Sequence, residues 1–366
     1  MQPLSLRALG RATLARQGLL ERQDWSVEDA VERVAGLQAQ EAMPPYVALW
    51  ARLDGFARED LHGRLHARRI VRGTSARGTL HLHTAEDYAS LRPTLQPVLT
   101  AGLRALGARA DGLDTDAVLA HARELLGRDA HTFGALRTAL SAAFPDADER
   151  ALGFTVRMLL PLVMVPTQDR WAFPPDAAFA PAEDLLGRPL CVEPDLPGLV
   201  LRHLRAFGPA TVADVQAWSG MKGLRGVVQD LRPELEELRD TRGRALYDVP
   251  DGLRPDEDTP APARLLGEFD GLLLAHADRT RLVDDEHRKG LVTKNLRVRA
   301  TFLVDGRVAG TWAIARRKGR VTLTLTPFAV LPGGTAEELE AEALGLLGFL
   351  EDGDAEKRVE VAAPPE

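Results

Sequence analysis

The segment 199–250 constrains the fold most tightly, because helical and strand patterns follow one another in it in a defined order. Apolar residues at helical spacing end at Gly208-Pro209, and Thr211 is a typical N-cap for a second helix. A third helical pattern and two short strands complete the segment. The elements are expected at 199–207, 212–218, 224–231, 235–240 and 245–249. Three helices followed by a hairpin make up a winged-helix unit, a relative of the helix-turn-helix.

The same order of elements recurs earlier in the chain, so three such units are expected in tandem. In the first of them, Ser26 is an N-cap with Asp29 at the third helical position, an acidic variant of the capping box. Helices are predicted there at 6–15, 26–38, 44–50 and 60–66, and a hairpin at 70–75 and 79–83. In the second unit, helices are predicted at 115–126, 133–144 and 149–160, and strands at 162–166 and 170–173.

The chain after residue 256 is rich in strands and ends in a helix. Asp305-Gly306 between two alternating runs is a strong hairpin signal, and Lys318-Gly319 predicts a second turn. Strands are expected at 271–276, 298–304, 307–315 and 321–328, and a final helix at 335–350. We therefore predict an α+β protein. Its regions are winged-helix units at 1–100, 101–195 and 196–255, and a β-rich region at 256–366 that carries a basic hairpin.

The charges are unevenly distributed, although the net charge of −7 is acidic. The stretch 61–85 contains five arginines, four histidines and no acid, and the stretch 286–320 contains ten Lys or Arg against two acids. Such segregation is typical of a basic face that follows phosphates on an otherwise acidic protein. Two solvated surface patches are the alternative explanation of the same pattern.

Several classes of protein are excluded or made improbable by the residues that the chain lacks. Cys191 is the single cysteine, which rules out an intramolecular disulfide, a cysteine-rich zinc site and a cysteine-ligated iron–sulfur cluster. No apolar run approaches the length of a membrane span, and the arginine-bearing N-terminus has no apolar core of a secretory signal. We expect a cytoplasmic protein that needs no metal and no cofactor.

Short motifs along the chain carry a resemblance to a known family. They are Leu37-Gln38-Ala39-Gln40, Pro45-Tyr46, 49–53, Arg77-Gly78-Thr79-Leu80-His81-Leu82, Phe269-Asp270, 273–274, His276-Ala277-Asp278-Arg279, 302–306 and 310–312. In order and spacing the sequence resembles the AlkZ-type, or YcaQ-like, winged-helix DNA glycosylases from near residue 6 to near residue 328. The resemblance implies a C-shaped molecule in which three tandem winged helices surround a positively charged concave surface. Members of this family remove alkylated bases, and some of them unhook interstrand crosslinks.

The resemblance also implies that Gln38 and Gln40 are the catalytic pair, in the Gln/Gln rather than the Gln/Asp form of the family signature. From spacing alone, two glutamines near a helix end are usually polar surface or backbone caps. Residues i and i+2 do not share a face of a regular helix. We therefore expect the pair at a frayed helix end or a turn before Pro44-Pro45, where both amides can converge.

Glutamine restricts the chemistry, because a carboxamide does not titrate near neutral pH and can serve neither as acid nor as base. An N3- or N7-alkylated purine is already cationic and leaves as a neutral base without protonation. Two side-chain carbonyls can then hold the attacking water and stabilise an oxocarbenium-like sugar. The expected reaction is monofunctional hydrolysis, because no motif positions a Schiff-base lysine; Lys294, the nearest candidate, is expected on phosphate.

Duplex DNA is the expected partner of a monomeric enzyme that does not associate with membranes. The predicted DNA contacts are Arg72, Arg77, His81, His276, Lys289, Lys294, Arg316, Arg317 and Lys318. The basic tip at 316–320 also has a simpler explanation, a charged turn that discourages association of strand edges. His81 and His83 share a strand face but lack a third ligand, so zinc is improbable. Asp270 and Asp278 could form structural ion pairs with Arg279 or Arg281.

Two other classes of function compete with a glycosylase. Winged helices occur most often in transcription factors, so a non-catalytic DNA-binding regulator is the main alternative. Three different units in one chain, without an evident dimerisation helix or effector domain, speak against it. An interaction protein that uses winged helices for protein contacts would also be compatible with the negative net charge.

Overall fold

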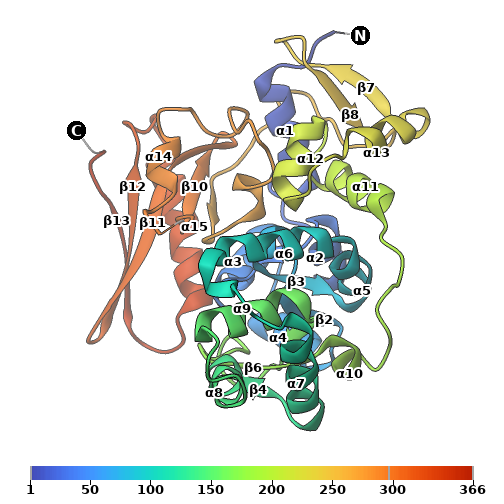
Figure 1. Ribbon diagram of the computed structural model, residues 1–366. Helices are drawn as coiled ribbons and strands as arrows, with labels where there is room; N and C mark the ends of the chain where they lie inside the picture. Colours follow the sequence, from blue (N-terminus) through green and yellow to red (C-terminus); the bar gives the residue numbers. More distant parts are fainter. Residues whose placement is uncertain (1, 296, 365–366) are drawn as a thin grey trace.

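The computed structural model describes residues 2–295 and 297–364 and has three sets of elements (Figure 1). Helices and short strands of the first half form the lower part of the view. A helical unit with a small hairpin, drawn in yellow, lies at the upper right, and a larger sheet, drawn in orange and red, lies at the left. The mixed α and β character agrees with the predicted class. No helix in the described part of the chain is long and apolar enough to cross a membrane.

One six-stranded sheet joins the first two expected units. Its order is β1-β3-β2-β5-β6-β4, and all of its pairs are antiparallel. The strands are β1 Leu37–Gln38, β2 Ile70–Thr74, β3 Leu80–Thr84, β4 His131–Thr132, β5 Leu162–Met164 and β6 Ala178–Pro181. Residues of both expected units also share one hydrophobic core, which runs from Val27 to Phe179. The first two expected units therefore share one sheet and one hydrophobic core.

The first half of the chain also forms helices, and most of them begin where the sequence predicts. They are α1 Leu6–Arg16, α2 Val27–Arg33, α3 Pro44–Arg52, α4 Arg58–His66, α5 Ala85–Thr94, α6 Gln96–Gly102, α7 Thr115–Arg128, α8 Phe133–Ala143, α9 Glu149–Leu159 and α10 Ala182–Leu186. Ser26 caps α2 as expected, its side chain accepting from the Asp29 amide. The sequence thus predicts the N-terminal start of α2 correctly.

The predicted helix over 26–38 is too long. The helix α2 ends at Arg33, and Ala35 and Gly36 follow with φ values of 60° and 88°. Left-handed residues end a helix, and glycine adopts this conformation without strain. A Cβ at Gly36 would lie 2.4 Å from the His83 ring, so the chain passes close to β3 here. As a result, Gln38 lies in strand β1 and not at the end of a helix.

A second correction concerns the expected strand at 170–173, which is a turn. Ala172 has a φ of 64°, and the turn is closed by hydrogen bonds from the Thr167 amide to Ala172 O and from the Ala172 amide to Asp169 O. The strand that pairs with β5 is β6, further along the chain. The predicted hairpin of the second unit therefore exists with a different second strand.

The elements predicted over 199–250 are observed in the predicted order. They are α11 Leu196–Phe207, α12 Val212–Ser219, α13 Arg225–Asp230, β7 Glu236–Arg239 and β8 Ala245–Asp248. Thr211 forms a capping box with Asp214, and the helices enclose a core of their own. The N-terminal helix α1 packs against α11, and Leu4 forms a bridge with Asp240 beside the hairpin. Figure 1 shows α1 beside this unit, so the start of the chain belongs to it in space.

The C-terminal region is a five-stranded sheet in the order β13-β12-β11-β10-β9. Its strands are β9 Arg264–Leu266, β10 Thr301–Val304, β11 Arg307–Arg317, β12 Arg320–Pro327 and β13 Glu356–Val361, and its helices are α14 Arg288–Leu291 and α15 Thr335–Leu350. The final helix was predicted with the same bounds, whereas β13, which runs parallel to β12, was not predicted. The predicted strand at 271–276 is wrong: Gly271–Leu273 is a 3₁₀ turn, capped by the Asp270 side chain.

Candidate active site

The Gln38-Ala39-Gln40 segment lies along the hairpin of β2 and β3. Gln38 is paired with His81 in the sheet, and the Ala39 amide donates to Leu80 O over 2.7 Å. Gln38 is buried, and Gln40 is partly exposed. Gln38 thus lies at the end of a short strand and not at a frayed helix end, whereas Gln40 lies in a bend before Pro44-Pro45, in agreement with the alternative placement in a turn. Both glutamines are held by the neighbouring hairpin, which the sequence did not indicate.

Hydrogen bonds fix which way each carboxamide points. Gln38 Oε1 accepts from Arg77 Nη2 at 2.7 Å, and Gln40 Oε1 accepts from the Leu80 amide at 2.8 Å. A guanidinium and a backbone N–H can only donate, so the oxygen rather than the nitrogen of each carboxamide must face them. A carboxamide oxygen has two lone pairs, and each of these contacts uses one of them. Each oxygen therefore keeps one acceptor position.

Arg72 holds the backbone of the same segment. Its Nε donates to Ala39 O at 2.9 Å, and its Nη2 donates to Gln40 O at 3.1 Å. The guanidinium lies over the Phe173 ring at 5.0 Å, and burial lowers the pKa of Arg72 to about 10. The side chain is only 4% exposed. Arg72 therefore supports the glutamine segment through its main-chain oxygens. This buried position does not suit the direct DNA contact that was predicted for Arg72.

His81 and His83 stack on one another, with ring centroids 5.6 Å apart, as their alternation on β3 predicts. His81 Nδ1 lies 3.1 Å from Thr79 O, and His83 Nε2 lies 2.9 Å from Ser75 Oγ. Burial lowers the pKa of His81 well below its usual value and that of His83 to about 3, so both are neutral at physiological pH. His81 is buried in the protein, which does not suit the predicted contact with DNA.

His276 is also enclosed, and its segment is structural. Its Nε2 lies 3.1 Å from Phe207 O, its ring contacts the His203 ring, and it is 1% exposed. Burial lowers its pKa well below the usual value. A contact between His276 and a DNA strand does not fit this position.

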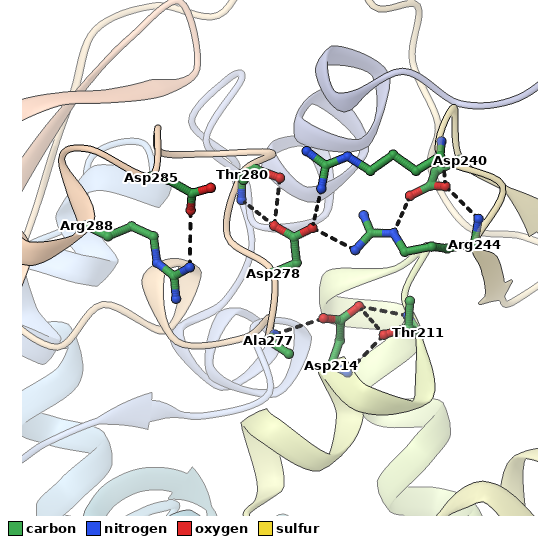
Figure 2. Close-up of polar contacts among 10 residues, drawn as sticks. Thr211, Asp214, Asp240, Arg244, Ala277, Asp278, Thr280, Asp285 and Arg288 are labelled. Atoms are coloured by element: carbon green, nitrogen blue, oxygen red, sulfur yellow. Dashed lines mark hydrogen bonds and ion pairs between the residues drawn. The ribbon is translucent and has the colours of Figure 1, made fainter.

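The residues after His276 tie a loop to the 199–250 unit, as Figure 2 shows. The Ala277 amide donates to Asp214 Oδ1 at 2.9 Å. Asp278 accepts from Arg244 at 2.7 Å, from Arg242 at 3.0 Å and from Thr280. Burial raises the pKa of Asp278, but the hydrogen bonds from Thr280 and Arg244 outweigh it and lower that pKa to about 2.

The predicted ion pairs of Asp270 and Asp278 are thus confirmed in kind but wrong in their partners. Asp270 pairs with Arg52 through two contacts of 2.8 and 2.9 Å, and both side chains are fully buried. The expected partners were Arg279 and Arg281. Among the described residues, neither of these arginines forms an ion pair with Asp270 or Asp278. The true partners lie far away along the chain, where no local pattern could indicate them.

The remaining predicted cations are exposed. Lys289 follows the start of α14, Lys294 lies in the loop before β10, and Arg316, Arg317 and Lys318 form the end of the long β11–β12 hairpin. Arg316 is paired with Glu351 at 2.6 Å. Within the described part of the chain, Arg317 and Lys318 have no carboxylate within 4.0 Å. These two cations are therefore available to an external anion.

Comparison with known proteins identifies the family of this chain. A family model described as "DNA glycosylase AlkZ-like" matches residues 31–349, a span that includes Gln38, Gln40 and the β11–β12 hairpin. Among solved structures, the Streptomyces sahachiroi DNA glycosylase AlkZ superimposes with a TM-score of 0.81 and 21% sequence identity, over 99% of this chain and 100% of that one. No curated protein sequence matches significantly. The structural likeness shows a shared fold, and the family model covers most of the sequence. The chain belongs to the AlkZ-like DNA glycosylase family and is accordingly a DNA glycosylase.

Proposed function

We propose that the enzyme excises cationic N-alkylated purines, with Gln38 and Gln40 holding the water that hydrolyses the N-glycosidic bond. The substrates in this class are N7-alkylguanine, N3-alkyladenine, and bulky adducts or crosslinks attached at these nitrogens. The observation that carries the proposal is the neutral character of the pair. Both side chains are carboxamides, and their hydrogen-bond partners within the described residues are an arginine and a backbone amide, not an acid.

The leaving group decides whether such a site can work. Most glycosidases protonate the departing group with one carboxyl and use a second carboxylate as nucleophile or base. Neither is available from a carboxamide. Alkylation at N3 or N7 places the positive charge on the base beforehand, so the bond breaks without an acid. This restricts the proposed substrate to cationic lesions and makes uracil or oxidised bases poor ones.

The free acceptor positions suit a water molecule. Each carboxamide oxygen has one lone pair that is not used by Arg77 or by the Leu80 amide. Two such acceptors can accept hydrogen bonds from both hydrogens of one water and direct its oxygen towards the sugar, which contributes by orientation. When the water oxygen bonds to the sugar carbon, its excess proton passes to solvent water, because a carboxamide does not take it up. Their dipoles also stabilise positive charge on an oxocarbenium-like sugar. No lysine enters this mechanism, in keeping with a monofunctional enzyme.

Glu41 is the carboxylate that could contradict this mechanism, because it follows Gln40 in the chain. It is exposed, and it lies 3.3 Å from Arg297, which also pairs with Glu268 at 2.5 Å. The Glu41 carboxylate is therefore part of an ion pair at the protein surface. We therefore assign Glu41 no part in the reaction, and its substitution is a suitable control.

Duplex DNA, in this proposal, binds along a basic concave face of a C-shaped monomer built from three winged-helix units. Its exposed contacts would be Lys289, Lys294, Arg316, Arg317 and Lys318. Phosphate contacts of this kind orient the duplex without reading its sequence. Membership of the glycosylase family favours a repair enzyme over the non-catalytic regulator.

Strand scission after base loss tests the proposal. A duplex with one N7-methylguanine is incubated with the protein and then treated with alkali, which cleaves at the abasic site. We expect scission by the unmodified enzyme and by Glu41→Gln, and none within the same incubation time by Gln38→Ala or Gln40→Ala, whose binding of the duplex is retained. Loss of activity in Glu41→Gln would assign the reaction to that carboxylate. Full activity in either alanine variant would reject the glutamine pair.

A further inference from the structure

Arg77 has an unusual position at the turn between β2 and β3. Its φ and ψ are 56° and 14°, in the left-handed region that residues with a side chain rarely adopt. The next residue, Gly78, also has a positive φ, of 71°. Such a conformation persists where the surroundings determine it strongly, and it is frequent at functional sites. The contacts of the Arg77 side chain hold the residue in this conformation.

The guanidinium joins two parts of the molecule that are distant in sequence. Nη2 donates to Gln38 Oε1 at 2.7 Å, and Nη1 donates to the main-chain oxygen of Trp218. Trp218 lies in the last turn of α12, where carbonyl groups have no partner within the helix. A cation at a helix C-terminus is also favoured by the helix dipole. Arg77 therefore connects the first glutamine of the pair to a helix of the 199–250 unit.

The packing at this junction is close. Gly220, the left-handed C-cap of α12 with a φ of 80°, lies against the turn. A Cβ at this position would be 3.4 Å from both Arg77 Cα and Arg77 Cγ, and 3.1 Å from Val98 Cγ1. The end of α12 and the β2–β3 turn thus determine each other's position, and a displacement of one is passed to the other.

No carboxylate compensates the charge of Arg77 among the residues that the structure describes. Its partners are two carbonyl oxygens, and the charge that acts on it most from nearby is that of Arg279. Burial, with a smaller effect of Arg279, lowers the pKa of Arg77 to about 10, which leaves it protonated at neutral pH. A structural arginine in such surroundings normally has an acidic partner. A positive charge at 2.7 Å instead polarises the Gln38 carboxamide and holds its oxygen in place.

We propose that Arg77 is a positioning residue that fixes the orientation of the Gln38 carboxamide and couples it to the end of α12. This inference rests on the proposed role of Gln38, and it replaces the expectation from the sequence that Arg77 binds DNA directly. Without the guanidinium, the carboxamide could rotate and present its NH₂ group where the water-holding oxygen is required. A shift of the 199–250 unit when it binds DNA would then change the orientation of the Gln38 carboxamide through Arg77.

A double-mutant cycle tests this role. Single-turnover base release from an N7-methylguanine duplex is measured for the unmodified enzyme, Arg77→Ala, Gln38→Ala and the double variant, together with the Kd of each for the duplex. We expect Arg77→Ala to slow release about 10²-fold with nearly unchanged Kd, as for a misplaced catalytic group. The double variant should be no slower than Gln38→Ala, because Arg77 acts only through Gln38.

Further variants separate positioning from folding. Arg77→Lys keeps a cation that can reach one carbonyl, so it should restore part of the rate; if Arg77→Ala does not fold, the same cycle is run with Arg77→Lys. Gly220→Ala should slow release in the unmodified background and add nothing to an Arg77 variant. Arg128→Ala, an exposed arginine of α7 paired with Glu124, is the matched control with unchanged rate.

The outcomes distinguish this inference from the proposed function. No base release by the unmodified enzyme would reject the proposed function itself. Release that Gln38→Ala slows to a measurable residual rate, with the effects of Arg77 and Gln38 multiplying in the double variant, would reject only the role of Arg77. An increase in Kd with an unchanged single-turnover rate in Arg77→Ala would show a DNA contact instead and would equally overturn the inference.

Discussion

Single buried arginines determine the geometry around the glutamine pair. Arg72 binds the backbone of the pair, and Arg77 binds a side chain of it. A third buried arginine, Arg52 at the end of α3, binds Asp270 in the same manner. A guanidinium with several planar donors suits such tasks, because one side chain can satisfy two or three carbonyl oxygens at once. These residues contact the protein rather than the substrate, so we expect their loss to act through stability or orientation.

The Arg52–Asp270 pair gives a stability prediction at this scale. Arg52→Ala leaves the Asp270 carboxylate, which is 0% exposed, without its cationic partner. Removal of one member of a buried pair costs about 3–5 kcal/mol, because the other charge stays desolvated. We expect that decrease in the free energy of unfolding by urea denaturation followed by circular dichroism. Arg128→Ala, at an exposed pair, should change it by less than about 0.5 kcal/mol, and equal effects of the two variants would contradict this prediction.

At the residue scale, the sequence pointed to the glutamines through a family motif, and their catalytic role stays a prediction; it did not indicate the arginines that hold them. Gln38 and Gln40 were found only because a short motif resembles a family. Arg72 and Arg77 were selected as cations and assigned to DNA, since nothing in a single sequence tells a buried arginine from an exposed one. The same limit applies to Asp278, whose partners Arg242 and Arg244 are far away in the chain.

At the scale of elements, turn chemistry and caps were predicted well. Asp305-Gly306 joins β10 to β11, Thr211 begins α12, and the hairpin of β2 and β3 lies where alternation placed it. The main error was the end of α2, where Val34-Ala35-Gly36 carries a glycine signal for helix termination that the apolar periodicity obscured. The parallel strand β13 was missed because its side chains are mostly exposed and lack an apolar face.

The β11–β12 hairpin gives a prediction about DNA affinity. The slope of log K against log salt concentration is negative, and removal of one phosphate-binding cation reduces its magnitude by about 0.9 for duplex DNA. If Arg317 and Lys318 each bind a phosphate, replacing both with alanine should reduce the magnitude of that slope by about 1.8. The slope is obtained from fluorescence anisotropy of a labelled duplex at several salt concentrations.

A control removes the same charge elsewhere. Arg123 and Arg128 are exposed on α7, and their double alanine variant lowers the net charge equally. It should leave the slope unchanged if the hairpin acts through local contacts. Equal changes in both double variants would show that only net charge matters.

At the scale of the whole molecule, contacts distant in sequence join the predicted units to one another. The buried pair of Arg16 with Asp248, at 2.7 Å, joins the first helix to the 199–250 unit, and one sheet spans 1–195. Both facts depend on tertiary pairing, which periodicity and turn signals in one sequence do not contain. The mixed α and β class was therefore predictable, whereas the contacts that join the units were not.

Buried histidines make the stability of the whole molecule depend on pH. Burial lowers the pKa of His83 to about 3 and of His203 to about 4, and those of His81 and His276 fall well below the usual value. In the unfolded chain the pKa is about 6.5. The unfolded state therefore binds more protons below pH 6.5, and the stability these groups contribute above that pH is lost as the pH falls.

Each of these four histidines, if it stays neutral in the folded protein, lowers the free energy of unfolding by roughly 1–2 kcal/mol between pH 7.5 and 5.5. Asp87, whose pKa burial raises to about 6, acts in the opposite direction by about 1 kcal/mol. We expect the free energy of unfolding, measured with urea at both pH values, to decrease by about 4–5 kcal/mol. An equal or higher value at pH 5.5 would mean that these histidines are not held neutral in the folded protein.

The most direct test of the central claim compares two duplexes that differ only in the charge of the leaving base. One contains N7-methylguanine, and the other contains 7-methyl-7-deazaguanine, which has the same shape but no positive charge. We predict that the enzyme releases the first base and not the second, because a carboxamide pair cannot protonate a neutral leaving group. Comparable single-turnover rates on both duplexes would contradict this claim and would require an acid at the site.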